Sequence, residues 1–463
     1  MTRAKTFRGL ALGFVAVMMS TTAWPVAAET LNEALATAYS SNPSLDAQRA
    51  SLRATDELVP QALSGWRPTV TVTGEVGRER RSSSLLSKRQ DLENKSVSLQ
   101  ITQPLFNGLK TMNGTSQAEN TVLAGRATLA SAEQSVLLGA VAAYVDVIRD
   151  QAVLELNRNN EEVLRRQLEA SNDRFRVGEI TRTDVAQSEA AVSGAISSRT
   201  QAEATLTSSR AAYQRVVGRL PDKLETPPAL PALPASEDEA RTIALSENPD
   251  LAASRLAELA AADVVKVAKG SLLPSAALVG TLSRAYDTTY ERDNATSAGI
   301  AAQVQVPLYQ SGAEYSQIRQ AQETHSQRRV LIASAERQVI EGVTNAWEQL
   351  RAARAVIVSS KEQVRANEIA LDGVRQEAAV GSRTTLDVLD AEQTLLNARV
   401  LLVRAQREEY VAGFQLLSAV GRLNAANLKL DVQVYDPAVN YEDVRGQWIG
   451  YKNDETGGES ILP

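Results

Sequence analysis

Apolar residues recur at helical spacing through two long stretches of the chain that contain no proline. The first stretch begins after Asn107 and continues to about Val177, and the second lies between Pro307 and Pro437. At about 1.5 Å per residue, a helix of roughly 70 residues is about 100 Å long. The first stretch carries two adjacent apolar stripes, at Val136, Ala140, Ala143, Val147 and Leu154 and at Leu137, Val141, Tyr144 and Ile148. Two stripes predict a neighbour on each side, as in a ring or sheet of helices.

The hydrophobic period changes to two in the region before the first long helix. Apolar residues alternate with polar ones in two runs, at Val70, Val72 and Val76 and then at Val97, Leu99 and Ile101. The insert between the runs, Ser82 to Lys95, is rich in serine and charge. This pattern predicts a β-hairpin with a long exposed loop. Residues 30–67, further upstream, have a helical pattern that is interrupted at Asn42 and Pro43, which predicts two shorter helices.

The same order of elements occurs a second time along the chain. Asn42, Pro43 and Pro68 match Asn248, Pro249 and Pro274 at a shift of 206 residues, and Pro104 to Phe106 match Pro307 to Tyr309 at a shift of 203. Strands are therefore predicted again at Ala276 to Arg284 and Ile300 to Val306, with Ala285 to Thr296 as the exposed loop. The length difference between the repeats falls in the hairpin loop, where it is tolerated. The chain is predicted to be an internal duplication.

A short turn joins the two long helices of each repeat. Gly178 and Gly381 stand at equivalent positions, 203 residues apart, and are predicted to adopt the left-handed conformation that ends a helix. After Gly381, Thr384 is predicted to cap the next helix, with Asp387 three residues later as in a capping box. The first turn repeats this pair at Thr181 and Asp184. The return helix of the first repeat is predicted from about Thr183 to Val217.

These patterns divide the chain into five segments. They are a signal peptide (1–28), a first repeat of helix, β-hairpin and long helical hairpin (29–220), a proline-rich linker (221–236), a second repeat (237–435) and a polar C-terminal tail (436–463). The signal peptide is indicated by the basic start, the short apolar run and the small residues that precede Glu29. The tail after Pro437 shows no periodicity and is left without a structural prediction.

Charge and cysteine content narrow the function classes. The formal charge is -6, and removal of Arg3, Lys5 and Arg8 with the signal peptide makes the rest of the chain more acidic, which disfavours nucleic-acid binding. The chain has 0 cysteines, so neither a disulfide framework nor an acylated cysteine is predicted. A secreted protein without an apolar run of about 20 residues is soluble or is held in the outer membrane by β-strands.

Strands of about ten residues suit a transmembrane β-barrel, but four strands are too few to close one. Several chains would therefore have to share a single barrel. Aromatic residues at the strand ends fit the two membrane interfaces, with Trp66, Phe106 and Tyr309 on one side and Tyr286 and Tyr290 on the other. The alternative is a soluble β-sandwich on a helical stalk.

The paired motifs give the chain a family resemblance. They are Asn42–Pro43 and Asn248–Pro249, Pro104–Phe106 and Pro307–Tyr309, and the turns Arg174–Gly178 and Val380–Arg383. Over essentially the whole chain after the signal peptide, the sequence resembles the TolC family of outer membrane efflux proteins. The resemblance implies a mainly α fold with β-strands, in which a homotrimer closes one twelve-stranded barrel in the outer membrane lipid of a Gram-negative bacterium. Twelve long helices would continue the barrel as a tunnel through the periplasm. The implied partners are a periplasmic adaptor and an inner-membrane transporter, in drug efflux or type I secretion.

The resemblance also assigns roles to residues near the second turn. Asp387 and Asp390 resemble the acidic residues that line the constriction at the periplasmic end of the tunnel. Thr183, Asp184 and Arg383 resemble members of the polar latch that holds the coils shut, with Ala378 where the family pattern has a tyrosine. A contact between Asp184 and Arg383 is expected, within or between chains. The alternatives are that Asp387 and Asp184 only cap their helices and that Arg383 is a solvated turn residue.

Catalytic chemistry has no candidate residues in this sequence. His325 is the only histidine, and its polar helical surroundings predict a solvated helix face. The sequence contains no Walker loop, paired metal-ligand histidines or cysteine nucleophile, so no enzyme activity, metal or cofactor is predicted. The prediction is a passive duct that is gated at its periplasmic end, and the alternative from another class is a periplasmic structural stalk or adaptor of long helical hairpins.

Overall fold

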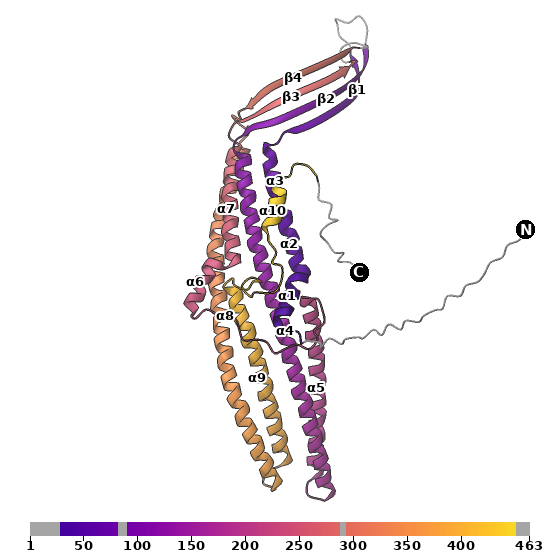
Figure 1. Cartoon of the computed structure of the whole chain (residues 1–463), viewed down its shortest axis with the longest axis vertical. Coiled ribbons are helices and arrows are strands. Elements are labelled where there is room, and N and C mark those ends of the chain that lie inside the picture. Colours follow the sequence, from indigo (N-terminus) through magenta and orange to yellow (C-terminus); the bar gives the residue numbers. More distant parts are fainter. Residues whose placement is uncertain (1–27, 82–89, 288–292, 451–463) are drawn as a thin grey trace, which may run out of the picture.

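The computed structural model describes residues 28–81, 90–287 and 293–450. The molecule is long and narrow, with a β-sheet at one end and two helical hairpins at the other (Figure 1). The first repeat contains α1 (Leu31–Ser41), α2 (Pro43–Asp56), α3 (Leu58–Leu63), the short 3-10 helix η1 (Ser64–Trp66), β1 (Thr69–Arg81), β2 (Gln90–Asn107), α4 (Lys110–Arg176) and α5 (Arg182–Val217). The second contains α6 (Glu237–Glu247), α7 (Pro249–Gly270), β3 (Ser275–Tyr286), β4 (Asn294–Gln305), α8 (Ala313–Ala379) and α9 (Thr385–Ala419), and α10 (Ala438–Arg445) follows.

The predicted long helices are confirmed. Helices α4 and α8 have 67 residues each, and each packs along the return helix that follows it, α5 or α9. Helix α4 also contacts α7 and α9, so it has the neighbours on both sides that its two stripes predict. Among the described residues, we find no helix that combines the length and the apolar character needed to span a bilayer.

The helical segment before β1 differs from the prediction of two helices. It breaks a second time at Glu57, so α2, α3 and η1 follow one another. Pro60 lies in the first turn of α3, where its missing N–H needs no partner. In the second repeat, Lys266 stands at the equivalent position, and α7 continues without a break to Gly270. The proline therefore accounts for the difference between the repeats.

The four strands form one antiparallel sheet in the order β1-β2-β3-β4. The loop predictions were too long, because β2 starts at Gln90 and β4 at Asn294. Opposite charges face each other across the β1–β2 ladder, where Arg78 and Arg80 bind Glu93 and Asp91 at 2.6 Å. Such cross-strand pairs extend a hairpin through a polar segment that composition alone indicates to be a loop. The centres of both predicted loops, residues 1–27 of the predicted signal peptide (1–28), Tyr290 and residues 451–463 lie outside the described residues.

The largest core lies at mid-length, where α1 and the linker pack against α4, α5 and α9. Tyr144 and Tyr213 are fully buried there. The Tyr144 hydroxyl lies 2.9 Å from the Glu29 carbonyl oxygen and 2.8 Å from that of Glu225, and the two share its one proton as acceptors. The Tyr213 hydroxyl donates to the Glu29 carboxylate at 2.6 Å. Arg219 binds the same carboxylate at 2.8 Å. The buried start of the first repeat is thus joined to the linker that follows it, and this junction fixes the base from which both hairpins extend.

Candidate pore constriction at the helical hairpin turns

The two turns between the long helices lie at the same end of the molecule, far from the sheet (Figure 1). Gly178 and Gly381 have φ values of 79° and 80°, which confirms the predicted left-handed conformation. A Cβ on either glycine would meet no atom within 4 Å, so the backbone conformation and not lack of space favours glycine. The turn is therefore set by its own residues.

Both predicted capping boxes are present. The Thr384 backbone N–H donates to Asp387 Oδ2 at 2.8 Å, and the Asp387 N–H donates to Thr384 Oγ1 at 3.2 Å. Thr181 and Asp184 make the same reciprocal pair at 2.9 and 3.4 Å. The backbone and hydroxyl hydrogen bonds from Thr384 hold the pKa of Asp387 below its ordinary value, and those from Thr181 lower the pKa of Asp184. Both carboxylates are therefore charged at neutral pH.

Asp390 differs from Asp387 in its surroundings. Its side chain is exposed, and among the residues that the structure describes it has no hydrogen-bond or ion-pair partner for its carboxylate. It lies three residues after Asp387 on α9, so the two side chains lie on neighbouring positions of one helix face. The capping box thus occupies Asp387, whereas the Asp390 carboxylate remains open to solvent.

The expected contact between Arg383 and Asp184 does not form within the chain. Arg383 Nε instead donates to Glu377 Oε2 at 2.8 Å, and Asp184 accepts from Thr181. Thr183 directly precedes Asp184 in the first turn of α5, and its side chain is exposed. Arg383 and Asp184 belong to different hairpins, and each carries its nearest partner on its own hairpin. A contact between chains stays a prediction.

A second ion pair spans the first turn and was not predicted from the sequence. Arg174, at the end of α4, donates through Nε to Glu179 Oε1 at 2.9 Å. Glu179 follows Gly178, and its backbone N–H donates to the Arg174 carbonyl at 2.9 Å. The signal in the sequence was the five-residue separation of opposite charges across a glycine turn, which places both side chains on the same side of the hairpin.

The aromatic residues assigned to the membrane interface lie where the helices meet the sheet. Trp66 is 40% exposed at the end of η1, Phe106 is half-buried near the end of β2, and Tyr309 is 83% exposed after β4. Tyr286 lies at the opposite end of the sheet, where the Arg284 guanidinium is 5.2 Å from its ring centroid. The four residues therefore occupy the two ends of the strands, as the sequence indicated.

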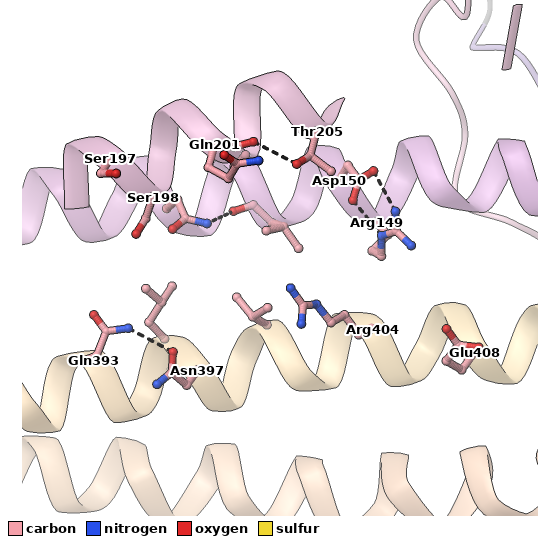
Figure 2. A pocket seen from close by; sticks show the side chains of 15 residues that line it. Arg149, Asp150, Ser197, Ser198, Gln201, Thr205, Gln393, Asn397, Arg404 and Glu408 are labelled. Carbon is pink, nitrogen blue, oxygen red and sulfur yellow. Dashed lines mark hydrogen bonds and ion pairs between the residues drawn. The ribbon is translucent and has the colours of Figure 1, made fainter. Parts of the chain in front are cut away.

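A polar groove runs between the two hairpins along α4, α5 and α9. Its wall on the first hairpin includes Arg149, Asp150 and Gln201, and its wall on α9 includes Asn397 and Arg404 (Figure 2). Asp150 is paired with Arg149 at 2.7 Å. The groove is lined by polar groups that are spread along three helices, and Asp150 and Asn157 among them are buried.

His325 corrects one expectation. It is half-buried between α8 and α7, and its Nε2 lies 2.6 Å from Glu258 Oε1, so it does not stand on a solvated face. The packing of α7 on α8, which a single helical period cannot reveal, brings Glu258 to it. Within the ranges 28–81, 90–287 and 293–450, no group of three or more His, Cys, Asp or Glu side chains is arranged to hold a metal ion.

Comparison with known proteins identifies the family. Two segments of the chain, residues 34–219 and 241–422, match the model of the family described as "Outer membrane efflux protein". The chain belongs to this family. It is 37% identical over 429 residues to the outer membrane efflux protein BepC of Brucella suis biovar 1 (strain 1330), which covers 92% of this chain and 93% of that protein. It is 27% identical over 355 residues to the outer membrane protein TolC of Escherichia coli (strain K12), which covers 72% of this chain and 70% of TolC.

The fold agrees with solved structures of outer membrane channels. The CmeC outer membrane channel of Campylobacter jejuni aligns with a TM-score of 0.78 at 15% identity, covering 90% of this chain and 89% of that one. As an outer membrane efflux protein, this chain is an exit duct of an efflux or type I secretion system, located in the outer membrane and extending into the periplasm. The duct is thus favoured over the structural stalk.

Proposed function

We propose that three copies of this outer membrane efflux protein close one twelve-stranded barrel, through which molecules leave passively. The observation that carries the proposal is the open sheet. Its two edge strands, β1 and β4, each have a neighbour on one side only, and every residue of β4 is exposed. Apolar side chains point out from both, with Val72 68% and Ile300 81% exposed. Unpaired strand edges and exposed apolar faces of this kind are normally covered by another strand, another chain or lipid.

Strand direction permits closure by copies of the same chain. All three ladders are antiparallel, so β1 and β4 run in opposite directions. The β4 edge of one copy can therefore pair in antiparallel fashion with the β1 edge of the next. This contact is heterologous, and a rotation of one third of a turn closes it into a ring. Three chains give twelve strands, which lies within the range of membrane barrels.

Strand length matches the thickness of the membrane. Strands β3 and β4 have 12 residues each. At about 3.3 Å per residue and a tilt of about 40°, a strand of this length spans roughly 30 Å, which is the thickness of the hydrocarbon core. The long helices then extend to one side of the membrane only, as the position of the sheet at one end of the molecule requires (Figure 1).

We further infer that the hairpin turns form the periplasmic entrance of the duct. Threefold symmetry would bring the Asp387 and Asp390 side chains of three chains toward one axis, where they would form an acidic ring that prefers cations. Arg383 of one chain would reach Asp184 of the next when the entrance is closed, in exchange for its contact with Glu377. A periplasmic adaptor and an inner-membrane transporter would supply cargo and energy.

Disulfide cross-linking tests the barrel, because the natural chain contains 0 cysteines. Thr73→Cys on β1 is combined in turn with Cys at four β4 alanines, Ala295, Ala298, Ala301 and Ala302, to scan the unknown register. Within one chain β1 and β4 are separated by two strands, or roughly 14 Å, which is too far for a disulfide. At the correct register we expect covalent dimers and trimers and nothing larger. Thr73→Cys alone is the control, and a monomer at every register or an unlimited ladder would contradict the proposal.

A further inference from the structure

The C-terminal segment continues beyond the end of α9 toward the sheet (Figure 1). Helix α10 packs beside α2 and α3 (Figure 1). Asn440 Nδ2 donates to Asp56 Oδ2 at 2.8 Å, Arg445 binds Glu119 at 2.9 Å, and Val444 is 2% exposed. The segment that the sequence left without a structural prediction is therefore fastened to α2 and α4 by polar contacts and burial up to Arg445.

Arg67 fastens the residues that follow α10 to the base of the sheet. Its Nη1 donates to the Gln447 carbonyl oxygen at 2.7 Å, and its guanidinium lies 5.0 Å from the centroid of the Trp448 ring. Arg67 directly follows Trp66 and precedes the start of β1 at Thr69 by two residues. One side chain thus holds Trp448 at the level where the chain enters the sheet.

The fastened segment displays apolar side chains to its surroundings. Trp448 is 64% exposed and Ile449 is 90% exposed, and Trp66 beside Arg67 is 40% exposed. The exposed face of β1 begins close by, with Val70 at 63%. A tryptophan that is held in place and still exposed, next to an isoleucine, has a surface that favours transfer out of water.

We propose that Trp448 and Ile449 form a membrane-interface anchor that inserts among the phospholipid headgroups on the periplasmic side of the outer membrane. The proposal rests on the proposed barrel, which places the base of the sheet at that interface. Tryptophan is enriched at this depth because its ring is apolar and its indole N–H is polar. The anchor fastens the C-terminal segment of the helical body to the bilayer independently of the strands.

Charge at the same level favours lipid as the occupant. Arg67 belongs to the connection into β1, Lys110 begins α4 close to Gly270, and Lys269 lies in the last turn of α7. Lys110 and Lys269 are exposed. These three basic residues stand at the junction of helices and sheet, where long cationic side chains can reach phosphate groups while their stems contact apolar surface. The apolar pair and the basic groups together match a phospholipid interface.

Tryptophan fluorescence provides the test, because the part of the chain after the predicted signal peptide contains only Trp66, Trp347 and Trp448. Three variants of the chain without residues 1–28 each keep one tryptophan and replace the other two with phenylalanine. Each is reconstituted in vesicles of phosphatidylcholine brominated either near the headgroup or deep in the acyl chain. For Trp448 we expect at least a twofold loss of emission with the shallow bromines and a smaller loss with the deep ones.

The other two single-tryptophan variants separate the anchor from the barrel. Trp66 reports insertion of the sheet, and Trp347, on α8 far from the sheet, is expected to keep its emission. Quenching of Trp66 without quenching of Trp448 overturns the anchor and leaves the barrel standing. The same conclusion holds if the Trp448 emission is blue-shifted but not quenched, because another copy of the chain then covers Trp448. Quenching of neither residue overturns both proposals.

Arg67→Met, made in the variant that keeps only Trp448, tests how the anchor is held. Loss of the hydrogen bond to Gln447 and of the stacking on Trp448 should reduce the difference between shallow and deep quenching at least twofold. Arg351→Met removes the same charge from an exposed pair on α8 and serves as the matched control. An unchanged depth profile in Arg67→Met, with Trp448 still quenched, would show that Arg67 does not position the anchor.

Discussion

Arg174 and Glu377 occupy equivalent positions at the ends of α4 and α8, 203 residues apart, yet they carry opposite charges. Arg174 binds Glu179 across the first turn, and Glu377 binds Arg383 across the second. The duplicated hairpins therefore keep an ion pair at the turn but reverse its direction. In the proposed ring the two hairpins would alternate. The reversed pairs would then place complementary charges on neighbouring turns, where contacts between chains would hold the proposed entrance closed.

Arg383→Ser is expected to raise single-channel conductance in planar bilayers, because in the proposed trimer Arg383 would bridge neighbouring hairpins. The change should have little effect on the unfolding temperature, since Arg383 and Glu377 are both about half exposed. Arg351→Ser, which breaks an exposed pair with Glu348 on α8, is the matched control. Equal conductance of Arg383→Ser and the unsubstituted protein would count against a latch at this residue.

Asp390→Asn is expected to weaken the preference of the channel for cations without lowering its thermal stability. The Asp390 carboxylate is exposed and takes no part in the capping box, so in the proposed entrance its charge would act on the surrounding solution and not on the fold. The measurement is the reversal potential in a tenfold KCl gradient. Asp443→Asn, on α10 and far from the turns, is the control for a changed net charge. A reversal potential that is unchanged in Asp390→Asn would remove Asp390 from the constriction.

The local features of the turns could be predicted from the sequence because neighbouring residues determine them. A glycine followed by Thr and then by Asp three residues later specifies the left-handed residue and the capping box at Gly381, Thr384 and Asp387. The duplication also supports the prediction of these elements, because the same pattern occurs at equivalent positions of both repeats. The long proline-free stretches likewise determine where α4 and α8 can lie.

Contacts between distant segments could not be predicted in the same way. The partner of His325 depends on how α7 packs on α8, and the start of β2 depends on charge pairs across the ladder, such as Arg80 with Asp91. Acidic residues occur at the turns of both hairpins. Within the chain Arg383 binds Glu377, which is brought close by the turn that both residues share. The fold was predictable where one hydrophobic period dominates a segment. At the turns, the backbone conformation and the capping boxes were predictable, whereas the ion-pair partners of the charged side chains were not.

Mild acid is expected to leave both capping boxes intact, and stronger acid is expected to break them. Hydrogen bonds from Thr384 and Thr181 lower the pKa of Asp387 and Asp184 in the folded state. A carboxylate whose pKa is lower in the folded state stabilises the fold at pH values above its unfolded-state pKa of about 3.9. This stabilisation is lost as the pH falls through the folded-state pKa. Thermal unfolding followed by circular dichroism from pH 7 to pH 2.5 measures the loss.

The matched variants for the acid effect are Asp184→Asn and Asp387→Asn together. They should lower the unfolding temperature at pH 7, since asparagine accepts the same backbone hydrogen bond without the charge. The difference from the unsubstituted protein should shrink below about pH 4. Glu348→Gln with Glu362→Gln, which affects two exposed pairs on α8, controls for general acid sensitivity. A constant difference across the whole pH range would show that the two carboxylates do not carry the effect.

Glycines with a left-handed backbone next to the helix ends should tolerate alanine very differently. Gly421 has a φ of 86°, and its added Cβ would lie 2.4 Å from the Glu247 carbonyl oxygen, so both strain and overlap oppose Gly421→Ala. We expect a loss of about 3 kcal/mol, against about 1 kcal/mol for Gly381→Ala, where only the left-handed backbone opposes alanine. Gly218, the equivalent of Gly421 in the first repeat, would bring a Cβ 3.3 Å from Ser41 Oγ and should give an intermediate loss. Thermal unfolding of the three variants in detergent measures the order, and a similar loss in all three would mean that the α9 terminus shifts away from Glu247 at little cost.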